Sequence, residues 1–270
     1  MIIYFSVFIL SFIQGLTEFL PISSSGHLIF LHSILPPLPI NDAAFDVMLH
    51  AGTLLAVIIF FFGDIREITL SWLRSLGKKE PDVNAKLGWY IVLATIPAAI
   101  MGYLFDDFIE EKLRSTIVVA IMLIVIAIFF IVVEKISKQS IQLKSMNWKK
   151  ALLIGCAQVL AFFPGTSRSG VTIIAGMAAN LNREAAVRFS FLISAPIILG
   201  ANIKKIPALL AAISDKSDLF ILLFGFSISY IVGYYVIKYF IIYVKNYSLN
   251  IFAYYRITLA VMIALLWMII

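Results

Sequence analysis

One of two polar segments in this chain has the composition of a phosphate site. PGTSRSGVT, residues 164–172, contains two glycines, four hydroxyl side chains and one fixed cation, Arg168. A glycine-rich turn that leads into a helix directs backbone N–H groups toward an anion. A guanidinium adds two parallel hydrogen bonds to phosphate oxygens. The predicted phosphate-binding residues in this segment are Gly165, Thr166, Ser167, Arg168, Ser169, Gly170 and Thr172.

The other polar segment, PISSSGH at residues 21–27, places hydroxyls and an imidazole near a carboxylate. Glu18 lies four residues after Gln14, so both side chains project from one face if this stretch is helical. Pro21 then ends that helix. The turn that follows is expected to hold Ser23, Ser24, Ser25, Gly26 and His27. Charged groups at membrane depth are costly and usually functional, which makes Glu18 a candidate, and His27 is one because it closes the same turn as the serines.

Simpler interpretations of these side chains stay open. Serine, threonine and glycine in membrane helices often only allow close helix packing, and this interpretation applies to Ser23, Ser25 and Thr166. Glu18 and Arg168 alternatively form a buried structural salt bridge.

We do not expect the two histidines and two aspartates that follow PISSSGH to take part in chemistry. His32 and His50 lack the polar neighbours that single out His27, and they are interpreted as structural or interfacial. Asp42 and Asp46 are expected to cap or flank the start of the next helix.

The composition identifies an integral membrane protein. The chain has 270 residues, of which 62% are hydrophobic and 13% charged, with a mean hydropathy of +1.02, well outside the range of soluble domains. A spanning helix needs about 20 mostly apolar residues, and six windows meet that length: roughly 45–62, 87–105, 116–133, 186–205, 219–243 and 251–270. The stretches 1–20 and 151–163 are each broken by a Pro/Gly/Ser segment, which favours re-entrant hairpins. The predicted fold class is all-α and polytopic, with six transmembrane helices and two re-entrant helical hairpins.

Basic residues in two loops set the expected orientation. The loops 64–86 and 134–150 each hold five lysines or arginines and account for much of the positive balance in a chain of net charge +6. Two spans separate them, so both lie on one side of the membrane, and the positive-inside rule makes that side cytoplasmic. The serine-rich segment then lies nearer the outer face. This pattern explains the charge without nucleic-acid binding, which is not expected.

The chain also matches itself when it is shifted by 143 or 144 residues. The shift aligns Gln14 with Gln158, Pro21 with Pro164, Ser24 with Ser167, Gly26 with Gly170, Phe45 with Phe189 and Ala51 with Ala195. The matches concentrate in polar and Pro/Gly positions, which favours duplication over chance similarity between apolar segments. We predict repeat halves at approximately 1–133 and 145–270 within a single membrane domain, 1–270. Each half holds three spans, so the halves insert with opposite orientation and the working site lies where the two breaks meet.

The two polar segments resemble the undecaprenyl-diphosphatase family of bacteria, membrane phosphatases associated with bacitracin resistance. QGLTEFLPISSSGH, residues 14–27, is similar to the family's Glu/Gln-x-x-x-Glu box with its following serine and histidine, and PGTSRSGVT is similar to its PGxSRSGxT motif. The flanking FDVMLHAGTLLAV and REAAVRFSFLISAPIILG also resemble the family, so the likeness covers essentially the whole chain. The resemblance implies six spans plus two re-entrant hairpins in an inverted repeat. It also implies removal of the terminal phosphate from undecaprenyl (C55 polyprenyl) diphosphate in the bacterial plasma membrane, which recycles the lipid carrier for cell-wall synthesis.

The resemblance assigns roles to single residues and implies a divalent metal. Gln14 and Glu18 fall on the acidic box, Ser24 and His27 on nucleophile or acid/base positions, and Arg168 with Ser167 and Ser169 on the phosphate clamp. We hypothesise that Mg²⁺ or Ca²⁺ bridges the diphosphate to Glu18 with help from the Gln14 amide, because oxygen ligands suit a hard cation and the chain has no Cys/His set for zinc. Gln14 stands where the family often has Glu, so one fewer carboxylate is available to the metal.

The sequence leaves the nucleophile and some wider questions open. Attack comes from Ser24 with His27 as its base, from His27 itself, or from a water positioned by Glu18 and His27. The alternative function is a secondary transporter or a lipid flippase with a midplane phosphate site. The expected partners are the polyprenyl diphosphate and membrane lipid. The sequence does not fix the oligomeric state, and a homodimer is one alternative.

Overall fold

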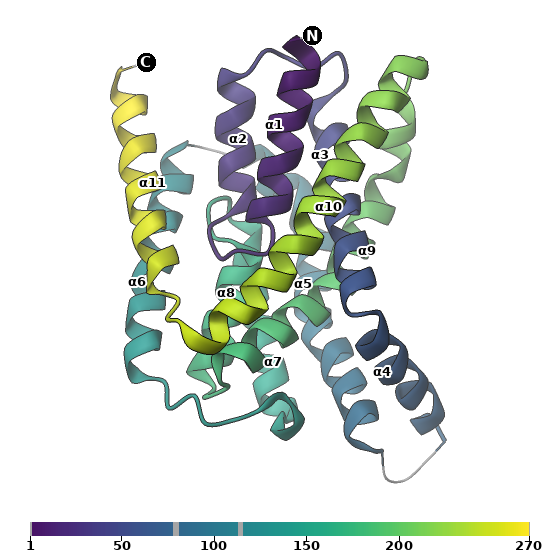
Figure 1. Ribbon diagram of the computed structural model, residues 1–270, viewed down its shortest axis with the longest axis vertical. Coiled ribbons are helices and arrows are strands. Elements are labelled where there is room, and N and C mark those ends of the chain that lie inside the picture. The colour runs from purple at the N-terminus through teal and green to yellow at the C-terminus, as the bar shows by residue number, and fades with distance from the viewer. Residues whose placement is uncertain (1, 78–80, 113–115, 270) are drawn as a thin grey trace.

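The structure, a computed structural model, is a helical bundle (Figure 1). It describes residues 2–77, 81–112 and 116–269, with side chains described outside residues 106–116 and 266–269. These residues form eleven α-helices and two short 3₁₀ helices, with no β-strand among them. The α-helices are α1 (Ile2–Thr17), α2 (Ser24–Ile34), α3 (Asp42–Phe60), α4 (Phe62–Ser75), α5 (Val83–Lys112), α6 (Thr116–Ile136), α7 (Trp148–Gln158), α8 (Arg168–Ala178), α9 (Arg183–Ala211), α10 (Lys216–Asn246) and α11 (Asn250–Ile269). The 3₁₀ helices are η1 (Leu143–Ser145) and η2 (Val159–Phe162).

The prediction of an all-α polytopic membrane protein is confirmed. Five helices are long and apolar enough to cross a membrane, namely α3, α5, α6, α9 and α10. They coincide with the first five predicted windows. The sixth window corresponds to α11, an apolar helix whose described side chains run to Leu265. Helix α4 was not predicted as a span, and its first and last turns carry Asp64 and Arg74.

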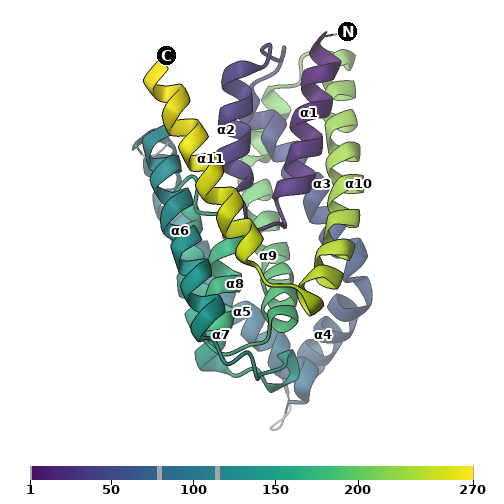
Figure 2. The ribbon, with the colours of Figure 1, turned by 60° about the vertical axis from the view of Figure 1, so that its left-hand side comes forward.

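Two interrupted hairpins enter the bundle from opposite ends (Figures 1 and 2). In the first, α1 runs inward from the side of the molecule where both chain termini lie and ends at Thr17. Helix α2 begins at Ser24 and runs back toward that side. In the second, α7 and η2 lead to a turn, and α8 begins at Arg168. The segment that connects α6 to α7 lies at the other end of the molecule. The two turns therefore meet inside the bundle, as the predicted hairpins require.

Corresponding helices of the two halves pack in corresponding ways. Helix α1 packs against α10 and α7 packs against α5, while the pairs α3 with α9 and α6 with α11 join the halves. Small residues allow the backbones to approach closely: an added Cβ at Gly15 would lie 2.8 Å from Val232 Cβ, and one at Gly155 would lie 2.5 Å from Ala94 O. This arrangement supports the duplication, although the boundaries of the halves stay a prediction.

The turn geometry corrects the register of the repeat. Ser23 and Ser167 both have φ of 74° and both cap the following helix, accepting from the backbone N–H of Gly26 and Gly170. Ser23 is therefore the structural counterpart of Ser167, and the pairing of Ser24 with Ser167 was wrong by one residue. With a constant shift of 144, Ser24 corresponds to Arg168, so the first residue of α2 matches the first residue of α8.

The backbone of the second turn requires a glycine at position 165. The φ of Gly165, 89°, is in the left-handed region, and an added Cβ would lie 2.5 Å from Val119 O on α6. We expect Gly165→Ala to lower the free energy of unfolding by about 1–3 kcal/mol through backbone strain, with the contact adding to that loss. The measurement is thermal unfolding in detergent. Gly200→Ala is the control, because nothing lies within 4 Å of the added Cβ and alanine favours the helix by about 0.5–1 kcal/mol. Equal melting temperatures for the two variants would contradict the assignment.

Candidate active site

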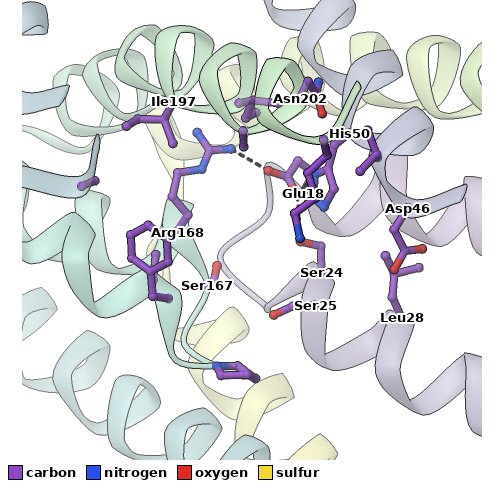
Figure 3. Close-up of a pocket in the computed structure, with 18 of the residues that line it drawn as sticks. Glu18, Ser24, Ser25, Leu28, Asp46, His50, Ser167, Arg168, Ile197 and Asn202 are labelled. Atoms are coloured by element: carbon purple, nitrogen blue, oxygen red, sulfur yellow. Dashed lines mark hydrogen bonds and ion pairs between the residues drawn. The ribbon is translucent and has the colours of Figure 1, made fainter. Parts of the chain in front are cut away.

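Glu18 is the point where the two interrupted hairpins meet. Arg168 Nη2 donates to Glu18 Oε1 at 2.7 Å, and Ser24 Oγ donates to Glu18 Oε2 at 2.8 Å. Gln14 Nε2 donates to the same Oε2 at 3.1 Å. Figure 3 shows Arg168 reaching Glu18 from one side and Ser24 lying on the other. The structure thus brings together four of the predicted site residues from both halves of the chain.

Helix caps bring Ser24 and Arg168 to these positions. Each is the first residue of its helix, directly after a serine cap with positive φ. The first N–H groups of a helix lack intrahelical partners, and with the helix dipole they favour an anion. Helices α2 and α8 therefore both begin at the cavity, each with a polar side chain on its first residue.

A cavity of about 330 Å³ surrounds this contact. Its polar lining residues are Glu18, Ser24, Ser25, Asp46, His50, Gln158, Ser167, Arg168, Asn202 and Lys205. Its apolar lining comes from α2, α3, α5 and α9 and from the segment 161–164. A polar centre beside apolar walls suits a ligand with a charged head and a hydrocarbon tail.

His50 belongs to the site, although the sequence interpretation assigned it a structural or interfacial role. Its Nδ1 lies 2.9 Å from Gln14 Nε2 and 3.5 Å from Glu18 Oε2, and the ring lines the cavity (Figure 3). Sequence reasoning missed it because its neighbours in the chain are apolar. A histidine within a predicted span was the available signal.

His27 does not line the cavity. Its Nδ1 lies 2.7 Å from Ser23 O and its Nε2 lies 2.7 Å from Tyr255 Oη, and the residue is buried. Both ring nitrogens are thus engaged away from Glu18. The geometry supports a role for His27 in holding the first turn against α11, and its predicted catalytic role has no geometric support.

Most other predicted phosphate residues hold the turns rather than face the cavity. Ser169 Oγ donates to Leu20 O at 3.1 Å, which ties the second turn to the first. Thr172 Oγ1 pairs with Ser190 on α9 at 2.6 Å, and Thr166 is fully buried. The cap Ser23 is fully buried, and Gly165 and Gly170 also stay outside the lining. Of the predicted phosphate-binding residues in the second segment, Ser167 and Arg168 line the cavity, as does Pro164 of the same segment. The N–H of Gly170 is already bonded to Ser167 Oγ.

Arg256 on α11 fixes both turns from behind the cavity. Its side chain is fully buried. Its guanidinium donates to five carbonyl oxygens, those of Pro21, Met122, Leu123, Gly165 and Thr166, at distances from 2.8 to 3.3 Å. Pro21 belongs to the first turn and Gly165 and Thr166 to the second, so one side chain sets the distance between them. The motif-based interpretation missed Arg256 because it lies outside both polar segments.

The oxygen donors beside Glu18 are of the type that a hard cation prefers. Among the described side chains no group of three His, Cys, Asp or Glu could hold a metal ion. Gln14 Oε1, however, is buried beside Glu18 and has no hydrogen-bond partner in the described part of the chain. Mg²⁺ is commonly held by one or two carboxylates together with substrate phosphates, so Glu18 and Gln14 Oε1 match the expected donor set.

This chain is similar over nearly its whole length to proteins named undecaprenyl-diphosphatase. The family model described as bacitracin resistance protein BacA matches residues 7–262. Two relatives named undecaprenyl-diphosphatase come from Alteromonas mediterranea, 41% identical over 263 residues that cover 97% of each chain, and Rubrobacter xylanophilus, 42% identical over 261 residues that cover 96% of each. A third of the same name, from Teredinibacter turnerae, is 42% identical over 258 residues, covering 95% of this chain and 97% of its own.

Replacing Arg256 tests its role in fixing the two turns. We expect Arg256→Met to lower the free energy of unfolding by about 3 kcal/mol or more, because several buried carbonyls lose their donor at once. The measurement is thermal unfolding in detergent. The control is Arg188→Met, where the side chain is 34% exposed and pairs with Glu184 and Asp64; an exposed pair contributes about 0–1 kcal/mol. If the two variants lost equal stability, Arg256 would not be the clamp described here.

Proposed function

The chain belongs to the bacitracin resistance protein BacA family, and from that premise we propose that it is an undecaprenyl-diphosphatase. The reaction is hydrolysis of undecaprenyl diphosphate to undecaprenyl phosphate and inorganic phosphate. The observation that carries the proposal is Glu18 held between Ser24 and Arg168 in one cavity. The three relatives named undecaprenyl-diphosphatase favour an enzyme over a secondary transporter or a flippase.

Arg168 acts as the phosphate clamp. Phosphoryl transfer depends mainly on positioning and on neutralising charge on the phosphate oxygens, and Arg168 is the guanidinium that lines the cavity. The helix starts at Ser24 and Arg168 place two positive dipole ends near the same phosphate. Glu18 and Gln14 Oε1 would hold a Mg²⁺ or Ca²⁺ ion, which would supply further charge neutralisation.

Ser24 with Glu18 is the nucleophile and base that the geometry supports best. Ser24 Oγ already donates its hydrogen bond to Glu18 Oε2 at 2.8 Å. Attack of Oγ on the terminal phosphorus passes the hydroxyl proton to Glu18, and the bond from that phosphorus to the bridging oxygen breaks, which releases undecaprenyl phosphate. Water then hydrolyses the phosphoserine to inorganic phosphate. His27 is not the base in this scheme, since its nitrogens face Ser23 O and Tyr255 Oη.

The cavity opens toward the outer face of the bacterial plasma membrane. Asp46 near the start of α3 and Lys205 near the end of α9 both line it. These helix ends lie on the side where both termini are found, opposite the C-terminal end of α4 (Figure 1). The described parts of the basic loops, residues 64–77, 81–86 and 134–150, lie toward that opposite end. The positive-inside rule makes it the cytoplasmic end in this proposal.

Phosphate release from a polyprenyl diphosphate tests reaction, substrate and metal together. Purified protein in detergent should release inorganic phosphate, EDTA should stop the release, and Mg²⁺ or Ca²⁺ should restore it. We expect Arg168→Ala to lower turnover by on the order of 100-fold or more, as loss of a transition-state donor commonly does. Arg74→Ala, on an exposed position of α4, is the control. Near-normal turnover by Arg168→Ala would remove Arg168 from the mechanism, and substrate movement in sealed vesicles without phosphate release would establish a transporter.

Ser24→Ala separates the serine route from direct attack by water. If Ser24 is the nucleophile, the variant should lose roughly 1,000-fold or more in turnover, and rapidly quenched wild-type protein should carry a phosphoryl group on Ser24, detectable by mass spectrometry. The matched control is Ser33→Ala on the same helix, since Ser33 is exposed and bonds only Phe30 O. A variant that keeps a tenth of the activity, together with unmodified Ser24, would assign the attack to water.

A further inference from the structure

The α7–α9 side of the cavity holds buried polar groups that the reaction above does not use. Gln158 is 1% exposed, and neither its Nε2 nor its Oε1 has a hydrogen-bond partner among the described residues. Asn202 Nδ2 on α9 is also buried and without a partner there. Both residues line the cavity. Unpaired buried amides are costly, so two of them in the lining of one cavity point to a ligand that binds there.

The repeat shows why Gln158 in particular is left unpaired. Its counterpart in the first half, Gln14, donates to Glu18 and lies 2.9 Å from His50. A shift of 144 residues replaces those two partners by Phe162 and Ser194. The phenylalanine offers no acceptor, and the Ser194 hydroxyl donates within its own helix. The second half thus has the glutamine, which lines the cavity, and lacks the groups that satisfy its counterpart.

The charges around Gln158 select an anion. Arg168 Nη1 is buried without a partner among the described residues, while its Nη2 donates to Glu18. Lys205 lines the same cavity and adds a second cation. The opposing groups in the lining are Glu18, which pairs with Arg168 Nη2, and Asp46 on α3, whose Oδ1 lies 3.0 Å from His32 Nε2. Two amides, one guanidinium and one lysine suit a ligand with several acceptor oxygens.

We propose that Gln158 and Asn202, with Arg168 Nη1 and Lys205, form a second phosphate subsite that binds the lipid-bearing phosphate of the substrate. The inference rests on the proposed function, in which Ser24 and Glu18 face the terminal phosphate. Arg168 joins the two subsites, with one nitrogen directed to each. Phe162, Ile197 and Ile198 also line the cavity and provide apolar surface for the first prenyl units. The subsite makes the enzyme select a diphosphate over a monophosphate.

Gln158→Leu tests the subsite through binding, without relying on turnover. The probes are methylenediphosphonate, which has two linked phosphorus groups and is not hydrolysed, and inorganic phosphate, measured by calorimetry on the purified protein with Mg²⁺. Wild-type protein should bind the diphosphonate more tightly than phosphate. Gln158→Leu should weaken diphosphonate binding about ten-fold or more, because hydrogen bonds to a charged group are lost, and change phosphate binding by less than about two-fold. Leucine has a similar volume and removes an unpaired amide, so the fold is expected to hold.

Two further variants complete the design. Asn202→Leu should also lower the preference for methylenediphosphonate over phosphate. This variant serves as the test if Gln158→Leu does not fold. Gln142→Leu makes the same replacement at an exposed position between α6 and α7 and should leave both affinities unchanged. Three results would overturn the subsite. The Gln158→Leu variant could bind both probes more weakly by the same factor, or bind both as tightly as the wild type. Alternatively, the wild-type protein could show no preference for the diphosphonate. Failure of the proposed function is a separate result, namely that wild-type protein releases no phosphate from polyprenyl diphosphate.

Discussion

Carbonyl oxygens in a turn at membrane depth need hydrogen-bond donors, and the hydrocarbon of a bilayer supplies none. The site of this protein is built from two such turns. Arg256 meets the requirement for both with one guanidinium, which donates to Pro21 O at 3.1 Å and to Gly165 O at 2.8 Å. Because the turns share a donor, the positions of Ser24 and Arg168 at the helix starts are fixed relative to each other. A residue that does not line the cavity therefore sets the geometry inside it.

The ion pair between Glu18 and Arg168 reconciles two interpretations that the sequence left as alternatives, a structural salt bridge and a catalytic pair. The side chains are 6% and 12% exposed, and two charges at that depth are tolerated because each is neutralised by the other. A substrate phosphate that binds Arg168 brings its own negative charge, so the guanidinium can exchange one oxyanion for another without being left unpaired. That exchange also releases Glu18 Oε1. The ion pair between Glu18 and Arg168 is thus the state of the site before the substrate binds. When the substrate phosphate breaks this ion pair, Glu18 becomes free to accept the proton of Ser24.

Local patterns predicted the turns well and the residues from neighbouring helices poorly. Proline, glycine and serine cluster at 21–27 and 164–170 and marked the two breaks, because these residue types favour helix ends and caps. The meeting of Glu18 with Arg168 followed from the repeat. His50 and Arg256 were not found, because each lies in an apolar helix and reaches the turns only through the packing of α3 and α11. The pairing of Ser24 with Ser167 was wrong by one residue, because the equivalence of Ser23 and Ser167 rests on their positive φ, which the sequence does not show.

The corrected register gives the duplication a chemical meaning. Equivalent positions at the two helix starts hold Ser24, a candidate nucleophile, and Arg168, a cation. Four residues after the shared glutamine, one half has Glu18 and the other has Phe162. The backbone of the two turns is alike, while the side chains have become opposite in character, with an acid and a hydroxyl on one side and a guanidinium on the other. A diphosphate needs such an arrangement, since one phosphate must be attacked while its neighbour is held and leaves. Two equivalent turns with unlike side chains provide both positions within a single cavity.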